Sequence, residues 1–171
     1  MINIHYQGIV KIAGHSCPTV AGAYLLTQKA LDALYGDATP LRGGVKVSFD
    51  SSMEEGTTGV VANVISNITG ATDKSGFKGL KGNFARHSLM QFSDPEVKGI
   101  KFTRVDTNES VTLSYHPEVV PPKEEQMQLM QKIMQKSATK EEQTAFSLLW
   151  QERVEQILLH HYNDPELVKI S

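Results

Sequence analysis

The sequence predicts an α+β domain with an antiparallel or mixed four-stranded sheet, helices packed on one face of that sheet, and a C-terminal helical hairpin. Apolar residues recur at helical spacing near both ends of the chain, and the middle contains segments in which apolar and polar residues alternate. The predicted order is helix, helix, strand, helix and three strands. Because helices and strands are segregated rather than alternating as βαβ units, this order is typical of the α+β class.

Two helices are predicted first. In residues 2–13 the apolar side chains lie three and four positions apart, which favours an amphipathic helix. The second helix begins at Pro18, because proline is favoured at the first helical position, and runs to about Tyr35, with Gly36 as its C-terminal cap. Small residues in this helix would let another part of the chain approach closely: Ala21, Gly22, Ala23 and Ala30.

The remaining part of the predicted domain contributes the sheet and one more helix. Residues 45–49 alternate apolar and polar side chains and indicate a strand, and residues 57–68 return to helical spacing. Residues 71–83 are rich in glycine and are predicted to form a loop that brings backbone close to a ligand or another chain. Three short strands are predicted near residues 84–92, 100–105 and 111–115, with a hairpin turn at residues 106–109.

A boundary is predicted at Pro121-Pro122, which separates a domain of residues 1–120 from an extension of residues 121–171. The extension starts with a stripe of methionine and isoleucine at helical spacing, and Thr139 and Glu142 form a capping box that opens a second helix. We expect these two helices to form a hairpin. Stripes rich in methionine either pack in a core or provide a docking surface, and both interpretations stay open.

Composition excludes several classes of function. The chain has 171 residues, 40% hydrophobic and 21% charged, with a formal net charge of −2 and no basic run, so we expect no nucleic-acid partner. No apolar stretch approaches the length of a membrane span and no signal-peptide pattern is present, so we expect a cytoplasmic protein without a membrane partner. The single cysteine, Cys17, excludes an intramolecular disulfide and a four-thiolate metal site.

The segment His15-Ser16-Cys17-Pro18 carries the strongest chemical signal. Cys17 is predicted to cap the helix that begins at Pro18, and the unpaired backbone N–H groups at a helix N-terminus stabilise a thiolate. Thiolate and imidazole are both zinc ligands, so His15 and Cys17 are candidates for a metal site. The same cysteine is also a candidate nucleophile.

Three segments together resemble the FmdE-like family, which is named for a component of formylmethanofuran dehydrogenase. They are residues 14–24 around the His-x-Cys-Pro motif, residues 67–72 and residues 82–86, in the family's order within the first 115 residues. The resemblance implies a mixed-order sheet with helices on one face, a homodimer, and an accessory role in metal or ligand binding beside a metabolic or redox protein partner. Thr69, Gly70, Thr72 and Asn83 form a polar, glycine-rich set that we expect to line a ligand pocket near Cys17. Arg86, in the family-like run, is a candidate to pair with an anionic ligand or to form a structural ion pair.

The chain departs from the family pattern at several positions. Relatives commonly carry a second histidine where Ala13 stands, cysteines where Val60 and Ala71 stand, and an acidic residue where Asn63 stands. The zinc-ribbon or ferredoxin-like part of larger relatives has no counterpart here. A zinc or other transition-metal ion would therefore need further donors. The candidates are His5, Asp50, Glu54, Glu55 and His87, of which His87 ranks first because it follows Arg86 next to the glycine-rich loop.

Three functions follow as alternatives. The first is a metal-binding or ligand-binding accessory protein with its site at His15 and Cys17. The second is a thiol-dependent enzyme with Cys17 as nucleophile, His15 or His87 as base and Arg86 as an anion anchor. The third is a haem-binding or partner-binding module, since Cys17-Pro18 matches the dipeptide of some thiolate-ligated haem sensors and the hairpin offers a surface for a partner.

Overall fold

Five strands form one mixed sheet in the order β2-β1-β3-β4-β5 in the computed structural model, which describes residues 2–171. β1 pairs with β2 in parallel, and the other three pairings are antiparallel. The strands are β1 (Val45–Phe49), β2 (Met90–Gln91), β3 (Ile100–Arg104), β4 (Ser110–Tyr115) and β5 (Val168–Ile170). The predicted α+β class is confirmed.

The prediction of four strands was wrong because β5 was missed. This strand has three residues, and it forms only where the end of the chain returns beside β4, with Tyr115 opposite Val168. A pairing between residues so far apart in sequence leaves little local signal. The strand predicted over residues 84–92 shrinks to Met90–Gln91, since the residues before it belong to the glycine-rich loop.

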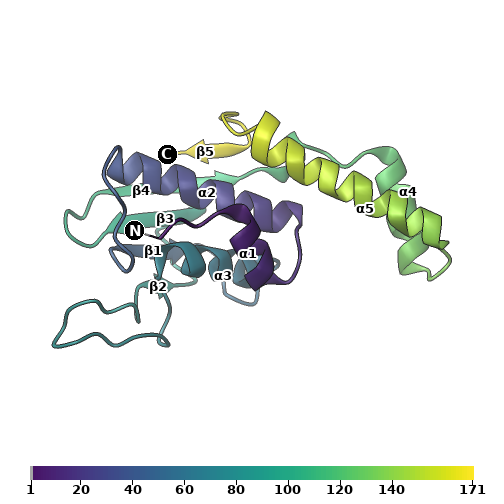
Figure 1. Cartoon of the computed structure of the whole chain (residues 1–171). Helices are drawn as coiled ribbons and strands as arrows, with labels where there is room; N and C mark the ends of the chain where they lie inside the picture. Colours follow the sequence, from purple (N-terminus) through teal and green to yellow (C-terminus); the bar gives the residue numbers. More distant parts are fainter. Residues whose placement is uncertain (1) are drawn as a thin grey trace.

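Three helices cover one face of the sheet: α1 (Tyr6–Ala13), α2 (Pro18–Tyr35) and α3 (Thr58–Thr69) (Figure 1). The predicted boundaries of α2 are confirmed, including Cys17 as its N-cap and Gly36 as its C-cap. Side chains alternate along β1, where Val45, Val47 and Phe49 are buried beneath the helices. The opposite face carries the polar positions, such as the exposed Lys46.

Helix α2 is the centre of the core. Eleven of its eighteen residues are buried, because it contacts α1 and α3 on one side and β4 below. The close approach predicted for its small residues is made by a side chain: the ring of Tyr115 from β4 lies against Gly22 and leaves no room for a Cβ atom there. The Tyr115 hydroxyl donates to the carbonyl of Pro18, and burial raises its pKa.

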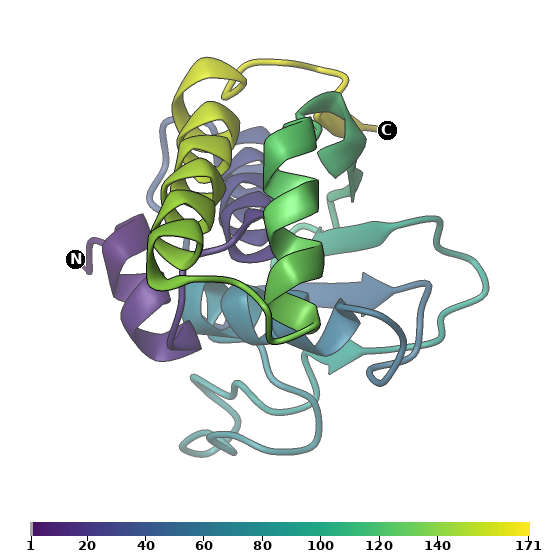
Figure 2. The same ribbon diagram turned by 90° about the vertical axis from the view of Figure 1, so that its right-hand side faces the viewer.

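The last fifty residues form the predicted hairpin, α4 (Glu124–Met134) and α5 (Lys140–Glu155), preceded by a short 3₁₀ helix, η1 (Pro117–Val119). A π-helical turn, η2 (Gln156–His160), extends α5, and the chain then returns to form β5. Val154, Ile157 and Leu167 belong to the same core as the N-terminal helices. The base of the hairpin is thus built into the domain, whereas the two helices run outward from it side by side (Figure 2).

The predicted capping box at the start of α5 is present. The Thr139 hydroxyl accepts from the Glu142 amide at 3.2 Å, and the Glu142 carboxylate accepts from the Thr139 amide at 2.9 Å. The carboxylate also pairs with Lys132 of α4 and so joins the two helices at their outer end. Across residues 2–171, no helix combines the length and the apolar character that crossing a membrane requires.

We expect this cap to weaken in acid. The hydrogen bonds from Lys132 and then from the Thr139 amide lower the pKa of Glu142. The ionised carboxylate therefore stabilises the folded protein fully above the pKa that Glu142 has in the unfolded state, and this stabilisation is lost as the pH falls through the lowered pKa of the folded state. Between pH 5 and pH 3, the urea midpoint of the wild type should therefore fall further than that of Glu142→Gln, whose neutral amide does not titrate. Equal falls in the two proteins would contradict this role.

Candidate functional site: a hollow between α1 and α3

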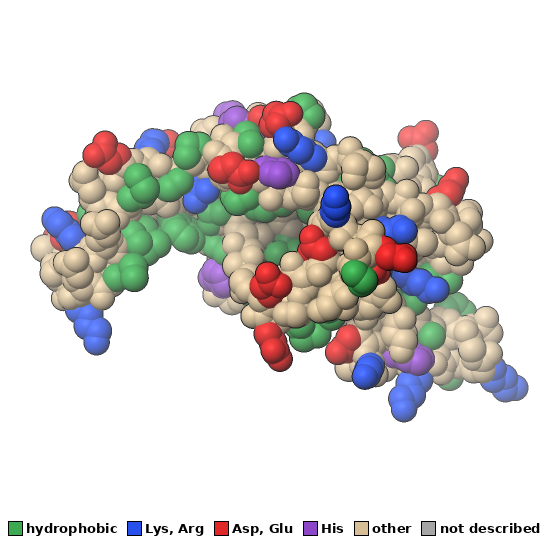
Figure 3. Space-filling view, turned by 180° about the vertical axis from the view of Figure 1, so that it is seen from behind, with side chains coloured by type: hydrophobic (Ala, Val, Ile, Leu, Met, Phe, Trp, Pro, Cys, Tyr) green, Lys and Arg blue, Asp and Glu red, His purple; other side chains and the backbone are tan. Residues whose placement is uncertain are grey.

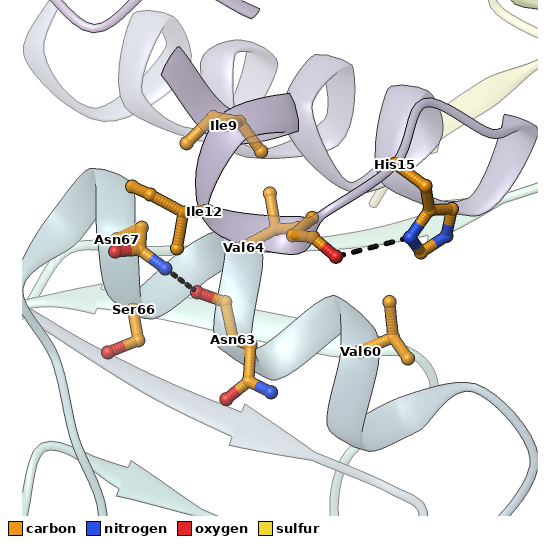
Figure 4. Close-up of a pocket in the computed structure, with 9 residues that line it drawn as sticks. Ile9, Ile12, His15, Val60, Asn63, Val64, Ser66 and Asn67 are labelled. Carbon is orange, nitrogen blue, oxygen red and sulfur yellow. Dashed lines mark hydrogen bonds between the residues drawn. The ribbon is translucent and has the colours of Figure 1, made fainter. Parts of the chain in front are cut away.

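The hollow that contains His15 lies between α1, the loop that follows it, and α3. Its volume is about 360 Å³, within the range of small-molecule sites. Apolar side chains from both helices form one part of its lining, and an imidazole, two amides and a hydroxyl form the rest (Figure 4). The lining residues are Ile9, Ile12, Ala13, His15, Val60, Asn63, Val64, Ser66 and Asn67. None of them is a lysine, arginine, aspartate or glutamate.

His15 is exposed and held by its own loop. Gly14 ends α1 in a left-handed conformation, with φ of 78°, and turns the chain so that His15 follows at the rim of the hollow. The His15 Nδ1 atom lies 3.1 Å from the carbonyl oxygen of Ala13. A neutral ring that donates through Nδ1 leaves Nε2 as an acceptor for a ligand.

Cys17 is buried rather than presented to solvent. Its side chain packs with Ile9, Val20 and Val64, and 6% of the residue is exposed. The sulfur accepts from the Val20 amide at 3.4 Å, as expected of an N-cap. The sequence signal for a helix N-terminus predicts correctly that Cys17 caps α2. It does not predict that α1 and α3 pack over the sulfur, because that packing depends on tertiary structure.

The loop between His15 and Pro18 is fixed by contacts from α1 and α5. The carbonyl oxygen of Ser16 accepts from Trp150 Nε1 at 3.0 Å and from Gln151 Nε2 at 3.2 Å, both from α5. The Ser16 hydroxyl meets the hydroxyl of Tyr6, the first residue of α1, at 2.9 Å. Helix α5 therefore helps to hold His15 at the rim of the hollow.

A second hollow lies on the other side of α3, with a volume of about 280 Å³. Asn63 and Ser66 line both hollows, so these two side chains separate them. Thr72 and Asp73 line the second one. The Thr72 hydroxyl lies 2.6 Å from the Ser75 carbonyl oxygen and 2.8 Å from that of Arg86, so it fastens the glycine-rich loop.

Thr69 and Gly70 are buried at the C-terminus of α3. The Thr69 hydroxyl donates a hydrogen bond to the Ile65 carbonyl and accepts one from the Ala71 amide, so it is used within the fold both as a donor and as an acceptor. Gly70 adopts a left-handed conformation with φ of 80°, which ends the helix. Arg42 donates to the Asn67 and Ile68 carbonyl oxygens at 2.7 and 2.9 Å, so these carbonyl groups in the last turn of α3 are hydrogen-bonded.

Asn83 is the last residue of the glycine-rich loop, and Arg86 and His87 follow it, at the end of α3 away from Val60. Asn83 lines a third hollow of about 380 Å³ together with Arg42 and Phe84. Arg86 lies beside Gly43 and Gly70. Burial, and then the nearby charge of Arg86, lower the pKa of Arg42. His87 Nδ1 contacts the Ser88 hydroxyl. Of the predicted ligand-binding residues, Thr72 and Asn83 thus line two different hollows, and Thr69, Gly70 and Arg86 line none of the three.

No protein-family model matches the chain, and no curated protein matches it. The resemblance to the FmdE-like family therefore stays a prediction. The structure does bring together four positions that this resemblance singles out, since Ala13, His15, Val60 and Asn63 all line the hollow between α1 and α3.

The residues present do not fit a closed zinc site within one copy. Structural zinc takes four thiolate, imidazole or carboxylate ligands, and the positions that would supply them carry alanine, valine and asparagine instead. Within residues 2–171, no three histidine, cysteine, aspartate or glutamate side chains gather closely enough to hold a metal ion. His15 is the only such residue in the lining of the hollow.

Sequence reasoning missed the apolar part of the lining. It places Ile9 on the core face of α1 and gives Ile12 and Val64 no part in a site. One signal was present in the sequence: Ile12 lies three residues from Ile9, so the two side chains fall near the same face of α1. Which helix would face it could not be read from the sequence.

Proposed function

We propose that this protein binds a small, uncharged, partly apolar molecule in the hollow between α1 and α3, with His15 as the residue that orients it. The observation that carries the proposal is the lining itself: an apolar surface, one exposed imidazole at the rim, and no lysine, arginine, aspartate or glutamate. Such a lining favours burial of an apolar body and selects a ligand by one or two hydrogen bonds.

Each part of the lining has a defined task in this proposal. Ile12 and Val60 offer the exposed apolar surface of the lining to the ligand, above the buried Ile9 and Val64, and the His15 ring pairs with one polar group. The Asn67 amide group donates to the Asn63 carbonyl at 2.8 Å, which leaves the Asn67 side-chain oxygen as an acceptor. A heteroaromatic ring that bears a hydroxyl or amide group has the matching chemistry.

The accessory binding role implied by the family resemblance is kept, whereas resident zinc is not part of the proposal because the donor set is too small. The alternative of a thiol-dependent enzyme is less well supported. Cys17 is 6% exposed, and its sulfur already accepts the Val20 amide. A thiol in this position lacks the access that a nucleophile needs.

Filling the hollow should abolish binding without unfolding the protein. Val60 lines the hollow from the first turn of α3 and is 39% exposed, so Val60→Trp can place its ring there at little cost to the core. A library of neutral hydroxylated and amide-bearing heteroaromatic fragments is screened by thermal shift, and hits are measured by calorimetry. We expect Val60→Trp to weaken hits by at least tenfold and His15→Ala to weaken them by about tenfold, the value of one hydrogen bond.

Val105→Trp is the matched control, because Val105 is 46% exposed and lies outside this hollow. It should bind the fragments as the wild type does. Hits that bind all three variants equally would contradict the proposed site. Stoichiometric zinc in the purified wild type, lost in His15→Ala, would contradict the proposed ligand class and support a metal site instead.

A further inference from the structure

The chain between α3 and β2 extends away from the sheet as a long loop (Figures 1 and 2). It consists of the glycine-rich loop and the residues that follow it, and we call residues 71–87 the basic loop. Within it, Leu80 and Asn83 exchange backbone hydrogen bonds of 2.8 and 3.0 Å. Lys81 and Gly82 between them have φ values of 50° and 84°, as a two-residue hairpin turn requires. The turn therefore has a defined shape.

Large apolar side chains are exposed on this loop and beside it. Leu80, directly before the turn, is 65% exposed, and Phe84, two residues after it, is 71% exposed. Phe77 is exposed as well. Phe84 lines the hollow of about 380 Å³ together with Leu41 and Val105, two further exposed apolar side chains. Single exposed apolar side chains are common, whereas such a cluster indicates a contact surface.

The same loop is basic. Its exposed basic side chains are Lys74, Lys78, Lys81 and Arg86. Within residues 2–171, none of the four forms an ion pair. The loop has one acidic residue, Asp73, whose carboxylate accepts from the amide and the hydroxyl of Ser75, both at 2.9 Å. Seen from behind, lysine and arginine side chains stand out at the lower right of the molecule (Figure 3).

The rest of the chain has the opposite charge. The sequence contains 17 basic and 19 acidic residues, and the basic loop holds four and one of them, which leaves 13 basic and 18 acidic residues elsewhere. A negatively charged partner would therefore attract the loop and repel the remaining surface. This difference would orient the molecule with its loop toward that partner.

The combination of basic and apolar side chains fits the surface of a bilayer that contains anionic lipids. Apolar side chains enter the boundary between headgroups and acyl chains, and lysine side chains stay at the level of the lipid phosphates. Single-stranded nucleic acid would need aromatic rings on which successive bases stack. In this loop the side chain directly before the turn is the aliphatic Leu80, which favours the bilayer.

We propose that the protein binds peripherally to an anionic lipid bilayer through the basic loop. Leu80 and Phe84 enter the bilayer interface, and Lys78 and Lys81 pair with lipid phosphates. From the sequence we expected no membrane partner because it contains no spanning segment, but peripheral contact needs no such segment. The proposal is independent of the ligand-binding function of the hollow beside His15.

Co-sedimentation of the full-length protein with vesicles tests the proposal. One set of vesicles is phosphatidylcholine alone, and in the other about 30% of the lipid is phosphatidylserine. We expect binding to the second set only, and weaker binding when sodium chloride is raised from about 100 to about 500 mM. Binding to neither set, or equal binding to both, would overturn the proposal. Binding to a thymidine oligonucleotide instead of the vesicles would likewise overturn it.

Serine substitutions test the apolar contact. Leu80→Ser with Phe84→Ser should weaken vesicle binding by about tenfold or more, because the apolar surface that enters the bilayer is lost. The matched control is Met134→Ser with Leu148→Ser. It removes two exposed apolar side chains from the α4–α5 hairpin, which we call the arm, and should bind as the wild type does. Equal losses in the two double variants would contradict the role of the loop.

Charge reversal tests the electrostatic contact. Lys78→Glu with Lys81→Glu should weaken binding to the anionic vesicles by about tenfold or more, since each basic residue near such a surface contributes roughly fivefold. Lys98→Glu with Lys140→Glu makes the same change in net charge outside the loop and should have a much smaller effect. All these side chains are exposed, so far-UV circular dichroism should show folded protein in each case. Equal effects of the two reversals would overturn the proposed orientation.

Discussion

Gly22→Ala should destabilise the protein by about 2–3 kcal/mol, although alanine is the better helix former. The reason is the ring of Tyr115, which occupies the space that a Cβ atom at position 22 would need. Either the ring moves and its hydroxyl loses the bond to the Pro18 carbonyl, 3.0 Å long, or α2 shifts away from β4. The free energy of unfolding from urea denaturation measures the effect.

Gly8→Ala is the matched control. Gly8 also lies within a helix, but nothing lies within 4 Å of the place where its Cβ atom would be. This substitution should stabilise the protein by about 0.5–1 kcal/mol through helix propensity alone. Combining Gly22→Ala with Tyr115→Ala should cost less than the sum of the two single changes, because the clash then disappears. Strict additivity would show that the ring is not the cause.

Trp150→Ala should cost about 2–4 kcal/mol and loosen the loop that carries His15. The change removes the indole from its contact with Phe146 and deletes the hydrogen bond from Nε1 to the Ser16 carbonyl. Hydrogen exchange at the amides of residues 15–20 should become faster. Because His15 lies directly on this loop, fragment binding in the hollow should weaken as well.

Trp150→Phe separates the two contributions. It keeps most of the apolar surface and loses only the hydrogen bond, so we expect a cost of about 1 kcal/mol and a smaller change in exchange. Gln151 still donates to the same carbonyl in this variant. If exchange at residues 15–20 were unchanged in Trp150→Ala, helix α5 would have no part in positioning His15.

Local signals predicted the helices well. Pro18, Cys17 and Gly36 set the limits of α2, and Thr139 with Glu142 sets the start of α5, because caps and proline act within one helical turn. Strand β5 depends on pairing across more than fifty residues and was missed. The short strand β2 depends on β1, since Met90 pairs with Val47.

The candidate site was predicted in part. His15 was found from its motif, and Ala13, Val60 and Asn63 were identified only as positions where the chain departs from the family pattern. Their convergence on one hollow depends on how α1 packs against α3, which sequence spacing does not encode. Cys17 shows the limit of local reasoning, because its role as a cap is local whereas its burial comes from Ile9 and Val64.

The most direct test of the binding site is a methyl-labelled NMR spectrum recorded with and without the tightest fragment. We expect the methyl signals of Ile9, Ile12, Val60 and Val64 to shift together with the ring signals of His15, because these residues surround one hollow. Signals from Leu80 in the glycine-rich loop and from Leu148 on the arm should stay in place. Shifts confined to those two residues, with the hollow unchanged, would contradict the proposed binding site.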